Sequence, residues 1–288
     1  LTVGEYLVSW LEGKQALRAS TRLSYRGHLH GYLIPHLGHH RLVELAPGHI
    51  EAMYRQVLAD NTDRARPTGP VTLRRVHATL LSALNTAVRR GLLPRNPAAT
   101  VELPRTDPAR TRSWTPTEAR RFLQATRDEP LSCLYRLLLV TGLRRGEAIG
   151  LRWDDLDLDQ GILQVTQQVV NVAGDLVIGP PKSSAGRRTI VLDEHTTDAL
   201  RLHALDRLNH AGALEGFVFG DGTSPLSPAY VSRHFDRLVP RYGLPRIRLH
   251  DLRHTSASLG LSSGETLLEV SRRLGHSSIG ITADTYTH

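Results

Sequence analysis

The sequence predicts a mainly α-helical protein of two domains, with a small antiparallel β-sheet in the second domain. Apolar residues recur at helical spacing through the first half of the chain. A stretch from Leu93 to Pro108 is rich in proline and has no clear period, as expected of an extended linker. The second half mixes helical periodicity with short β-like segments. Because 288 residues exceed one average domain of about 100–200 residues, we expect domains at about 1–107 and 108–288.

The first domain is predicted to be helical throughout. Two apolar series at helical spacing mark its first and last helices: Val3, Tyr6, Leu7, Trp10 and Leu11, then Leu73, Val76, Leu80, Leu81, Leu84 and Val88. Breaks are expected at Pro35–Gly38, at Pro47 and across Asp60–Pro70. The segments between these breaks predict four helices.

The second domain is predicted to begin with a capped helix. Thr115 can cap it, Pro116 suits its first turn and Glu118 completes a capping box. Two further helical patterns follow to about Leu151. Three β-like segments come next, and we predict that they form one three-stranded antiparallel sheet: Gly161–Val170, Leu176–Ile178 and Arg188–Leu192. Helical periodicity returns from His195, with a helix start at Ser227-Pro228 and breaks at Gly260, Gly264 and Gly275.

Charge and composition limit the kinds of partner. The chain has 36 Lys and Arg against 28 Asp and Glu, a formal net charge of +8, which favours a polyanionic partner. No apolar run approaches the ~20 residues of a membrane span, so we expect a soluble protein without a membrane partner. A single cysteine, Cys133, excludes a disulfide within the chain and predicts a small buried hydrophobe. The first residues lack the pattern of a secretory signal, so we expect the cytoplasm.

Four short segments concentrate residues that carry chemistry. They are Thr141–Glu147, Pro181–Ser183, Leu249–Thr255, and Leu274–His276 leading to Tyr286. Transfer of a phosphodiester without a metal needs a nucleophile, cations for the non-bridging oxygens, and proton donors and acceptors. The arginines, lysine, histidines and tyrosine of these segments meet each need.

Spacing within these segments supports the same chemistry. His250 and Arg253 stand three residues apart on a predicted helix, so they share one face and can converge on one phosphate. Arg144 follows a glycine near a turn into a helix, where backbone N–H groups favour anions.

The segments resemble the tyrosine recombinase (phage integrase) family, whose active site combines five elements. These are a Thr-Gly-Leu-Arg box, a β-hairpin lysine, a His-x-x-Arg box, a Leu-Gly-His box and a tyrosine about nine to ten residues later, and all occur here in that order. The resemblance implies that Arg144 and Arg253 clamp the scissile phosphate. His250 and His276 would bond it or assist proton transfer, and Lys182 would protonate the departing 5′ oxygen. Tyr286 would form a 3′-phosphotyrosyl link, with neither ATP, cofactor nor metal.

The resemblance also implies partners and a DNA clamp. The helical first domain would be a core-type DNA-binding domain that closes on duplex DNA opposite the catalytic domain. Its basic residues Arg22, Arg74, Arg75, Arg89 and Arg90 could contact phosphates. A homotetramer on two attachment sites would integrate or excise a phage or other mobile element in the bacterial cytoplasm, with accessory bending or directionality proteins.

Each of these residues also has an ordinary structural interpretation. Alone, Tyr286 would be a packing residue and Lys182 a solvated loop residue, and Arg145 is expected on the surface. Glu147 could orient the site or form an ordinary helix ion pair. His254 stands four residues after His250, but no third metal ligand is evident.

Three other functions were considered. A type IB topoisomerase would use the same chemistry without a specific DNA site. A DNA-binding regulator on the same fold would have lost some of the six polar positions, none of which is missing. A binder of membrane surfaces or anionic proteins would leave the ordered boxes unexplained.

Overall fold

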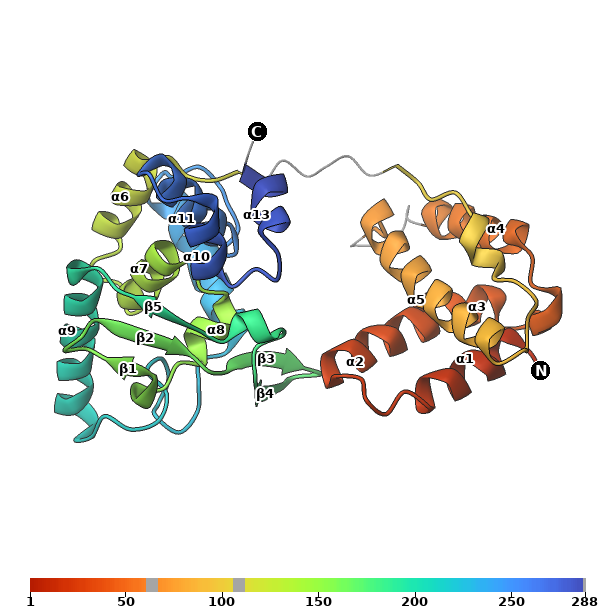
Figure 1. The fold of residues 1–288 in the computed structure, drawn as a ribbon, viewed down its shortest axis with the longest axis horizontal. Helices are drawn as coiled ribbons and strands as arrows, with labels where there is room; N and C mark the ends of the chain where they lie inside the picture. The colour runs from red at the N-terminus through yellow and green to blue at the C-terminus, as the bar shows by residue number, and fades with distance from the viewer. Residues whose placement is uncertain (61–66, 106–111, 287–288) are drawn as a thin grey trace. The chain divides into compact units, whose positions relative to one another are not determined.

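The computed structural model describes residues 1–60, 67–105 and 112–286, and the side chains of 211 and 284–286 lie outside that description. The chain divides into two compact units, Leu1–Ala109 and Arg110–His288, called unit 1 and unit 2 below (Figure 1). The domain boundary expected near residue 108 falls among residues 106–111, which lie outside the described residues.

Unit 1 is helical in its described parts. Its elements are α1 (Val3–Glu12), α2 (Ala19–His28), the π-helical segment η1 (Leu29–Leu33), α3 (Ile34–Leu37), the 3₁₀ turn η2 (Leu42–Glu44), α4 (Pro47–Ala59), α5 (Pro70–Arg89) and the 3₁₀ turn η3 (Pro97–Thr100). The segments α2, η1 and α3 follow one another without a gap and form one continuous helical stretch. With α1, α4 and α5, the described part of unit 1 therefore has four such stretches, as predicted. Of the break predicted across Asp60–Pro70, residues 61–66 lie outside the described residues.

Pro35 alters a helix without ending it. The Ile34 N–H donates to the Leu29 carbonyl five residues back, the π-type pattern, immediately before the proline. Proline has no N–H to donate, and π-helical hydrogen bonding, although rare, occurs mostly as single turns inside α-helices. The stretch then ends at Leu37, inside the predicted break.

The core of unit 1 joins its first and last helices. The Tyr6 hydroxyl donates to the Ala83 carbonyl at 2.6 Å, and Trp10 Nε1 donates to Thr86 Oγ1 at 3.2 Å. The predicted extended linker is wrong for its first part, because Leu93 and Ala98 are buried against this core. The Asn96 side chain caps the η3 turn there and donates to the Leu81 carbonyl. Apolar side chains between the prolines therefore hold this stretch on unit 1.

Unit 2 mixes helices and short strands. Its elements are α6 (Pro116–Ala125), α7 (Ser132–Thr141), α8 (Arg145–Ile149), the 3₁₀ turn η4 (Trp153–Asp155), β1 (Leu156–Asp157), β2 (Ile162–Val165), β3 (Gln168–Val172), β4 (Asp175–Gly179), the 3₁₀ turn η5 (Ser184–Gly186), β5 (Arg188–Val191), α9 (Glu194–Ala211), α10 (Pro228–Arg241), α11 (Asp251–Ser262), α12 (Leu267–Leu274) and α13 (Ile279–Tyr286). The Thr115–Glu118 capping box and the helix start at Pro228 are confirmed.

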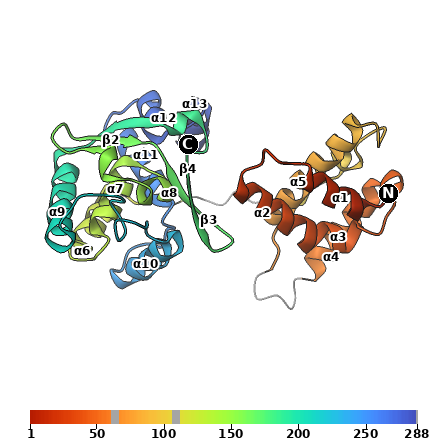
Figure 2. The same ribbon diagram turned by 90° about the horizontal axis from the view of Figure 1, so that it is seen from below.

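The prediction of one three-stranded sheet is wrong in its pairing. One antiparallel sheet has the order β1-β2-β5, and β3 pairs only with β4 in a separate hairpin. The predicted segment Gly161–Val170 divides between β2 and β3, which belong to different sheets. Figure 2 shows the β3–β4 hairpin at the edge of unit 2. Because the hairpin closes through the tight turn at Ala173-Gly174, its strands pair with each other.

Helix α7 lies in the core of unit 2. An aromatic cluster surrounds it, with ring centroids 5.5 Å apart for Phe122 and Tyr135 and 4.9 Å apart for Trp114 and Phe122. Helix α11 packs against α7, and α13 packs against α12. This arrangement brings the carboxyl end of α7 beside α11, where two of the chemical segments meet.

The break predicted at Gly260 is wrong, because α11 continues through it to Ser262. A Cβ at Gly260 would lie 2.7 Å from both Arg273 Nη2 and Glu265 Oε2. Glycine here therefore permits a close ion pair rather than a turn. In the described part of the chain, no helix is long and apolar enough to cross a membrane.

Candidate active site

Arg144 is placed by a sharp turn between α7 and α8. Gly142 ends α7 with φ +67°, and a Cβ there would meet Leu274 Cδ2 at 2.4 Å, so only glycine fits. Arg144 then caps the amino end of α8 with extended backbone. The turn thus presents Arg144 beside the carboxyl end of α12.

The two predicted clamp arginines donate to backbone carbonyls of the other chemical segments. Arg253, only 4% exposed, donates from Nη1 to the Gly142 carbonyl at 2.6 Å and from Nη2 to the Leu274 carbonyl at 2.7 Å. Arg144 Nη2 donates to the Gly275 carbonyl at 3.3 Å, and its side chain remains 35% exposed. Segments 141–147, 249–255 and 274–276 therefore meet at one place.

Both predicted histidines face this cationic cluster. Burial of the ring and the positive charges of Arg253 and Arg144 lower the pKa of His276 to about 4. The pKa of His250 is likewise lowered to about 4, first by burial of its ring and then by the charges of His254, Arg253 and Arg144. The residue as a whole is nevertheless exposed. Both imidazoles are therefore neutral at pH 7 and can each donate one hydrogen bond and accept another.

These lowered pKa values predict acid destabilisation. Both lie below the ordinary value of 6.5, so the unfolded chain takes up protons on these histidines before the folded chain does. Their contribution to the free energy of unfolding is full above pH 6.5 and is lost as the pH falls toward 4. Urea unfolding at intervals of pH should show this fall, and His276→Gln should make it shallower. Equal slopes for the two proteins would contradict the assignment.

Lys182 and Tyr286 are not joined to this cluster by any described contact. Lys182 is exposed in the loop between β4 and β5. That loop does approach the cluster, since a Cβ at Gly275 would lie 2.7 Å from the Ala185 carbonyl oxygen. Tyr286 is the last residue of α13, and its side chain lies outside the described residues.

Thr282, which the sequence reasoning did not single out, connects α13 to the cluster. Its side chain is fully buried, and its Oγ1 lies 2.8 Å from His276 Nδ1. A hydrogen bond at Nδ1 fixes the orientation of the imidazole and which nitrogen carries the proton. The spacing of Thr282, four residues before Tyr286 on one helix, was the available signal.

Removing this hydroxyl should be costly. Thr282→Val keeps the shape but leaves His276 Nδ1 without this partner, so we expect a loss of about 1–3 kcal/mol of unfolding free energy. Thr282→Ser should lose less. Urea denaturation measures the loss, and ¹⁵N NMR of His276 should report a changed tautomer population in the valine variant only. An unchanged His276 spectrum would mean that the hydroxyl does not orient the ring.

Glu147 and Arg188 form a buried ion pair next to Arg144. Glu147 is 1% exposed and accepts from Arg144 Nη1 at 2.7 Å and from Arg188 Nη2 at 3.0 Å. Of the two roles considered for Glu147, contact with two arginines favours orientation of the site. The sequence reasoning missed Arg188. The available signal was its place two residues before buried Ile190 on β5, on the same face of the strand.

Arg145 corrects an expectation, because it is partly buried and donates to Ser232 Oγ at 2.6 Å. Cys133 is likewise only partly buried; its thiol donates to the Ala199 carbonyl. By contrast, Trp10, Trp114 and Trp153 are buried.

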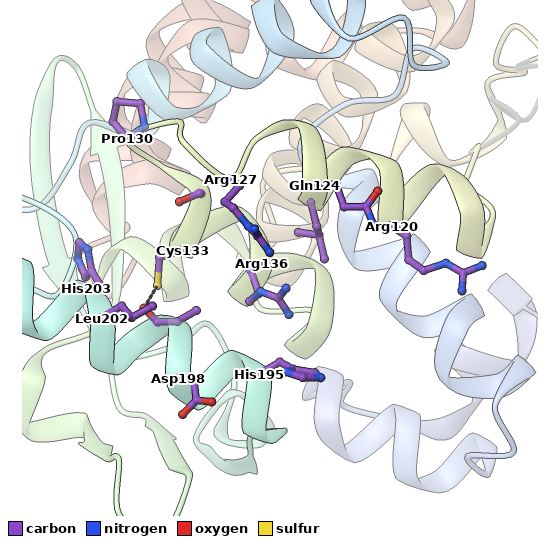
Figure 3. Close-up of a pocket in the computed structure, with 13 residues that line it drawn as sticks. Arg120, Gln124, Arg127, Pro130, Cys133, Arg136, His195, Asp198, Leu202 and His203 are labelled. Atoms are coloured by element: carbon purple, nitrogen blue, oxygen red, sulfur yellow. Dashed lines mark hydrogen bonds between the residues drawn. The ribbon is translucent and has the colours of Figure 1, made fainter.

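A cavity of about 690 Å³ lies elsewhere in unit 2 and contains none of the six predicted residues. Figure 3 shows Arg127, Cys133, Arg136 and His195 among its labelled lining residues, which come from α6, α7, α9 and the connection between α6 and α7. A pocket suits a small ligand. We assign the chemistry to the arginine and histidine cluster instead, because that cluster holds the groups that phosphodiester transfer needs.

Known proteins were compared with the chain. Residues 112–288 match the profile of the phage integrase family. The putative prophage phiRv2 integrase of Mycobacterium tuberculosis is 29% identical over 285 residues, covering 96% of this chain and 72% of the relative. The integrase of Mycobacterium phage L5 is 29% identical over 280 residues, with the same coverage of each chain.

Solved structures show a similar fold. The Tn1549 transposon integrase in complex with a circular intermediate DNA matches with a TM-score of 0.85 at 21% identity, covering 100% of this chain and 95% of that one. The lambda integrase tetramer bound to a Holliday junction matches with a TM-score of 0.73 at 20% identity, covering 99% and 77%. The mainly helical fold with small antiparallel sheets is therefore that of these integrases.

Proposed function

The chain belongs to the phage integrase family and is a site-specific DNA recombinase of the kind used by mobile elements, and from this premise we propose that it cleaves DNA through Tyr286. The observation that carries the proposal is the meeting of Arg144, Arg253, His250 and His276 in one cationic cluster. Duplex DNA from attachment sites is the substrate. The relatives come from bacteria and their phages, which supports the bacterial cytoplasm as the place of reaction.

The arginines bind the scissile phosphate. Each places a planar guanidinium, suited to phosphate oxygens, at the cluster. Arg253 is held by two backbone carbonyls and Arg144 by Glu147, so neither needs large rearrangement when DNA binds. Preorganised cations stabilise the charge that develops on the non-bridging oxygens.

Cleavage then proceeds by substitution at phosphorus. The Tyr286 oxygen forms a bond to phosphorus as the bond to the 5′ oxygen breaks, leaving a 3′-phosphotyrosyl link. The neutral imidazole of His250 accepts the phenol proton, and His276 donates a hydrogen bond to the phosphate. Lys182 gives a proton to the departing oxygen, which becomes a 5′-hydroxyl. A 5′-hydroxyl from the partner DNA reverses these steps, so the reaction requires neither ATP nor a metal.

Unit 1 supplies the second DNA-binding surface of a clamp. Its exposed basic residues support this role and include Arg74, Arg75, Arg89 and Arg90 of α5 and the next turn. Four protomers on two sites would complete an exchange, by analogy with the lambda integrase tetramer on a Holliday junction. Accessory proteins that bend DNA or set direction complete the assembly.

The test is a covalent adduct formed without metal. The protein is mixed with a nicked suicide substrate carrying its attachment sequence in EDTA, and products are separated on a denaturing gel. We expect a protein–DNA band on this substrate and none on a scrambled duplex. Equal adduct on both duplexes would favour the topoisomerase alternative. No adduct on cognate DNA, despite tight binding, would favour a DNA-binding regulator.

A further inference from the structure

Arg188 joins three segments of the candidate site. Nη2 donates to Glu147 Oε2 at 3.0 Å, Nε donates to the Arg273 carbonyl at 2.6 Å, and Nη1 donates to the Gly186 carbonyl at 2.9 Å. These partners belong to α8, to the end of α12 before His276, and to the loop that carries Lys182. All three guanidinium nitrogens of Arg188 donate to these partners, and the side chain is only 7% exposed.

Glu147 also binds Arg144, and so connects Arg188 to it. Its Oε1 accepts from Arg144 Nη1 at 2.7 Å, and its Oε2 accepts from the Arg144 backbone N–H at 2.9 Å as well as from Arg188. The carboxylate thus fixes both the backbone and the side chain of Arg144. Arg188 provides the second cation on the same carboxylate.

The charges explain why two arginines are needed. A buried carboxylate that lacks sufficient counter-charge takes up a proton, and the neutral carboxyl group then no longer holds Arg144 by an ion pair. With Arg188 present, Glu147, Arg144 and Arg188 together retain one positive charge. Arg144 is the more exposed of the two arginines, at 35% against 7%, so the excess charge faces outward there.

We propose that Arg188 is a positioning residue for strand cleavage: it holds the Glu147 carboxylate so that Arg144 meets the scissile phosphate in a fixed orientation, and it ties the Lys182 loop to the His276 segment. The proposal rests on the proposed function. In this role Arg188 acts through Glu147 and two backbone carbonyls rather than on the phosphate itself.

The pKa of Glu147 supports this assignment. Burial raises the pKa of this carboxyl, but the charge and hydrogen bond of Arg188, followed by those of Arg144, bring it below its ordinary 4.5. The other titratable groups near the pair are Arg273 of α12, which acts on Arg188, and His276, whose pKa Arg188 lowers. Removing Arg188 should therefore let the buried Glu147 take up a proton nearer to neutral pH.

The first experiment measures adduct formation in single turnover between pH 6 and 9. Arg188→Met should bind the attachment site within about threefold of wild type but form adduct about 10²-fold more slowly at pH 6, because a mispositioned group can cost that much. Its rate should recover as the pH rises and Glu147 ionises. Glu147→Gln should be slow at every pH. An Arg188→Met rate that follows the wild-type profile would overturn the proposal.

Arg207→Met is the matched control. Arg207 lies on α9 and, like Arg188, donates to two backbone carbonyls, those of Gly220 and Asp221. It should lower stability while leaving the pH profile of adduct formation unchanged. If Arg207→Met and Arg188→Met changed the profile alike, the effect of Arg188 would be general destabilisation and the proposal would fail.

A second experiment needs no activity and separates this proposal from the proposed function. Relative to wild type, Arg188→Met should lose some stability at every pH, because the Arg273 and Gly186 carbonyls lose their donor. The loss should grow as the pH rises from 4 toward 7, because the buried Glu147 carboxylate then ionises without the Arg188 counter-charge. Urea unfolding measures this deficit. A Glu147→Gln background should remove most of its pH dependence. If the pH dependence persists in the Glu147→Gln background, it arises from His276, and the proposed role of Glu147 is overturned. This outcome does not depend on whether wild type forms an adduct.

Discussion

Replacing Tyr286 by phenylalanine is expected to abolish the covalent protein–DNA adduct while leaving affinity for the attachment site within about twofold. The change removes only the attacking oxygen, and without it the phosphate has no nucleophile from the protein. The arginine cluster that we propose binds the phosphate does not depend on that oxygen. A denaturing gel measures the adduct, and a native gel shift measures affinity on the same substrate.

Tyr230→Phe provides the matched control for this prediction. Tyr230 is a partly exposed tyrosine of α10, outside the four chemical segments. It should form adduct at the wild-type rate. A persistent adduct in Tyr286→Phe would reject Tyr286 as the nucleophile, and mapping of the labelled peptide would then identify the residue that attacks.

Replacing Arg253 by methionine is expected to slow adduct formation about 10²- to 10³-fold, or about 3–4 kcal/mol of transition-state stabilisation. It should also lower thermal stability. Arg253 is buried and donates to the Gly142 and Leu274 carbonyls, which lose this donor in the variant. Single-turnover adduct formation at saturating protein gives the rate, and thermal unfolding gives the stability.

Arg144→Met should separate the effect on the rate of adduct formation from the effect on thermal stability. Arg144 is partly exposed and makes one backbone carbonyl contact, so its loss should slow the reaction by a similar factor with a smaller fall in melting temperature. Arg201→Met, which removes an exposed ion pair on α9 and a bond to the Leu158 carbonyl, should leave the rate unchanged. If both clamp variants weakened DNA binding but cleaved at the wild-type rate when saturated, the arginines would serve binding alone.

Much of the fold followed from local patterns in the sequence. The helix starts at Pro116 and Pro228 were predictable because capping and proline preferences act within one turn. The predicted β segments overlap β2, β3, β4 and β5, but β1 was missed. The pairing of the strands was also wrong, because short segments of similar composition pair according to the turns between them. The stretch that begins at Leu93 was predicted to be an extended linker because it is rich in proline. Its apolar residues instead pack on the core of unit 1.

The order of the chemical segments, the type of each polar residue and the spacing of His250 from Arg253 were determined by the sequence alone, because they depend on residue identity and on the period of a helix. Only the tertiary structure decided how those residues are held. Arg188 meets Glu147 across 41 residues, and Arg253 meets the Gly142 carbonyl across 111. Such long-range pairs cannot be predicted from a local sequence pattern. In the sequence each arginine resembles a surface residue, and its burial follows only from the packing of the strand or helix that carries it. The physical reason is that a charge can remain in the interior only where folding brings its counter-charge or a carbonyl to it.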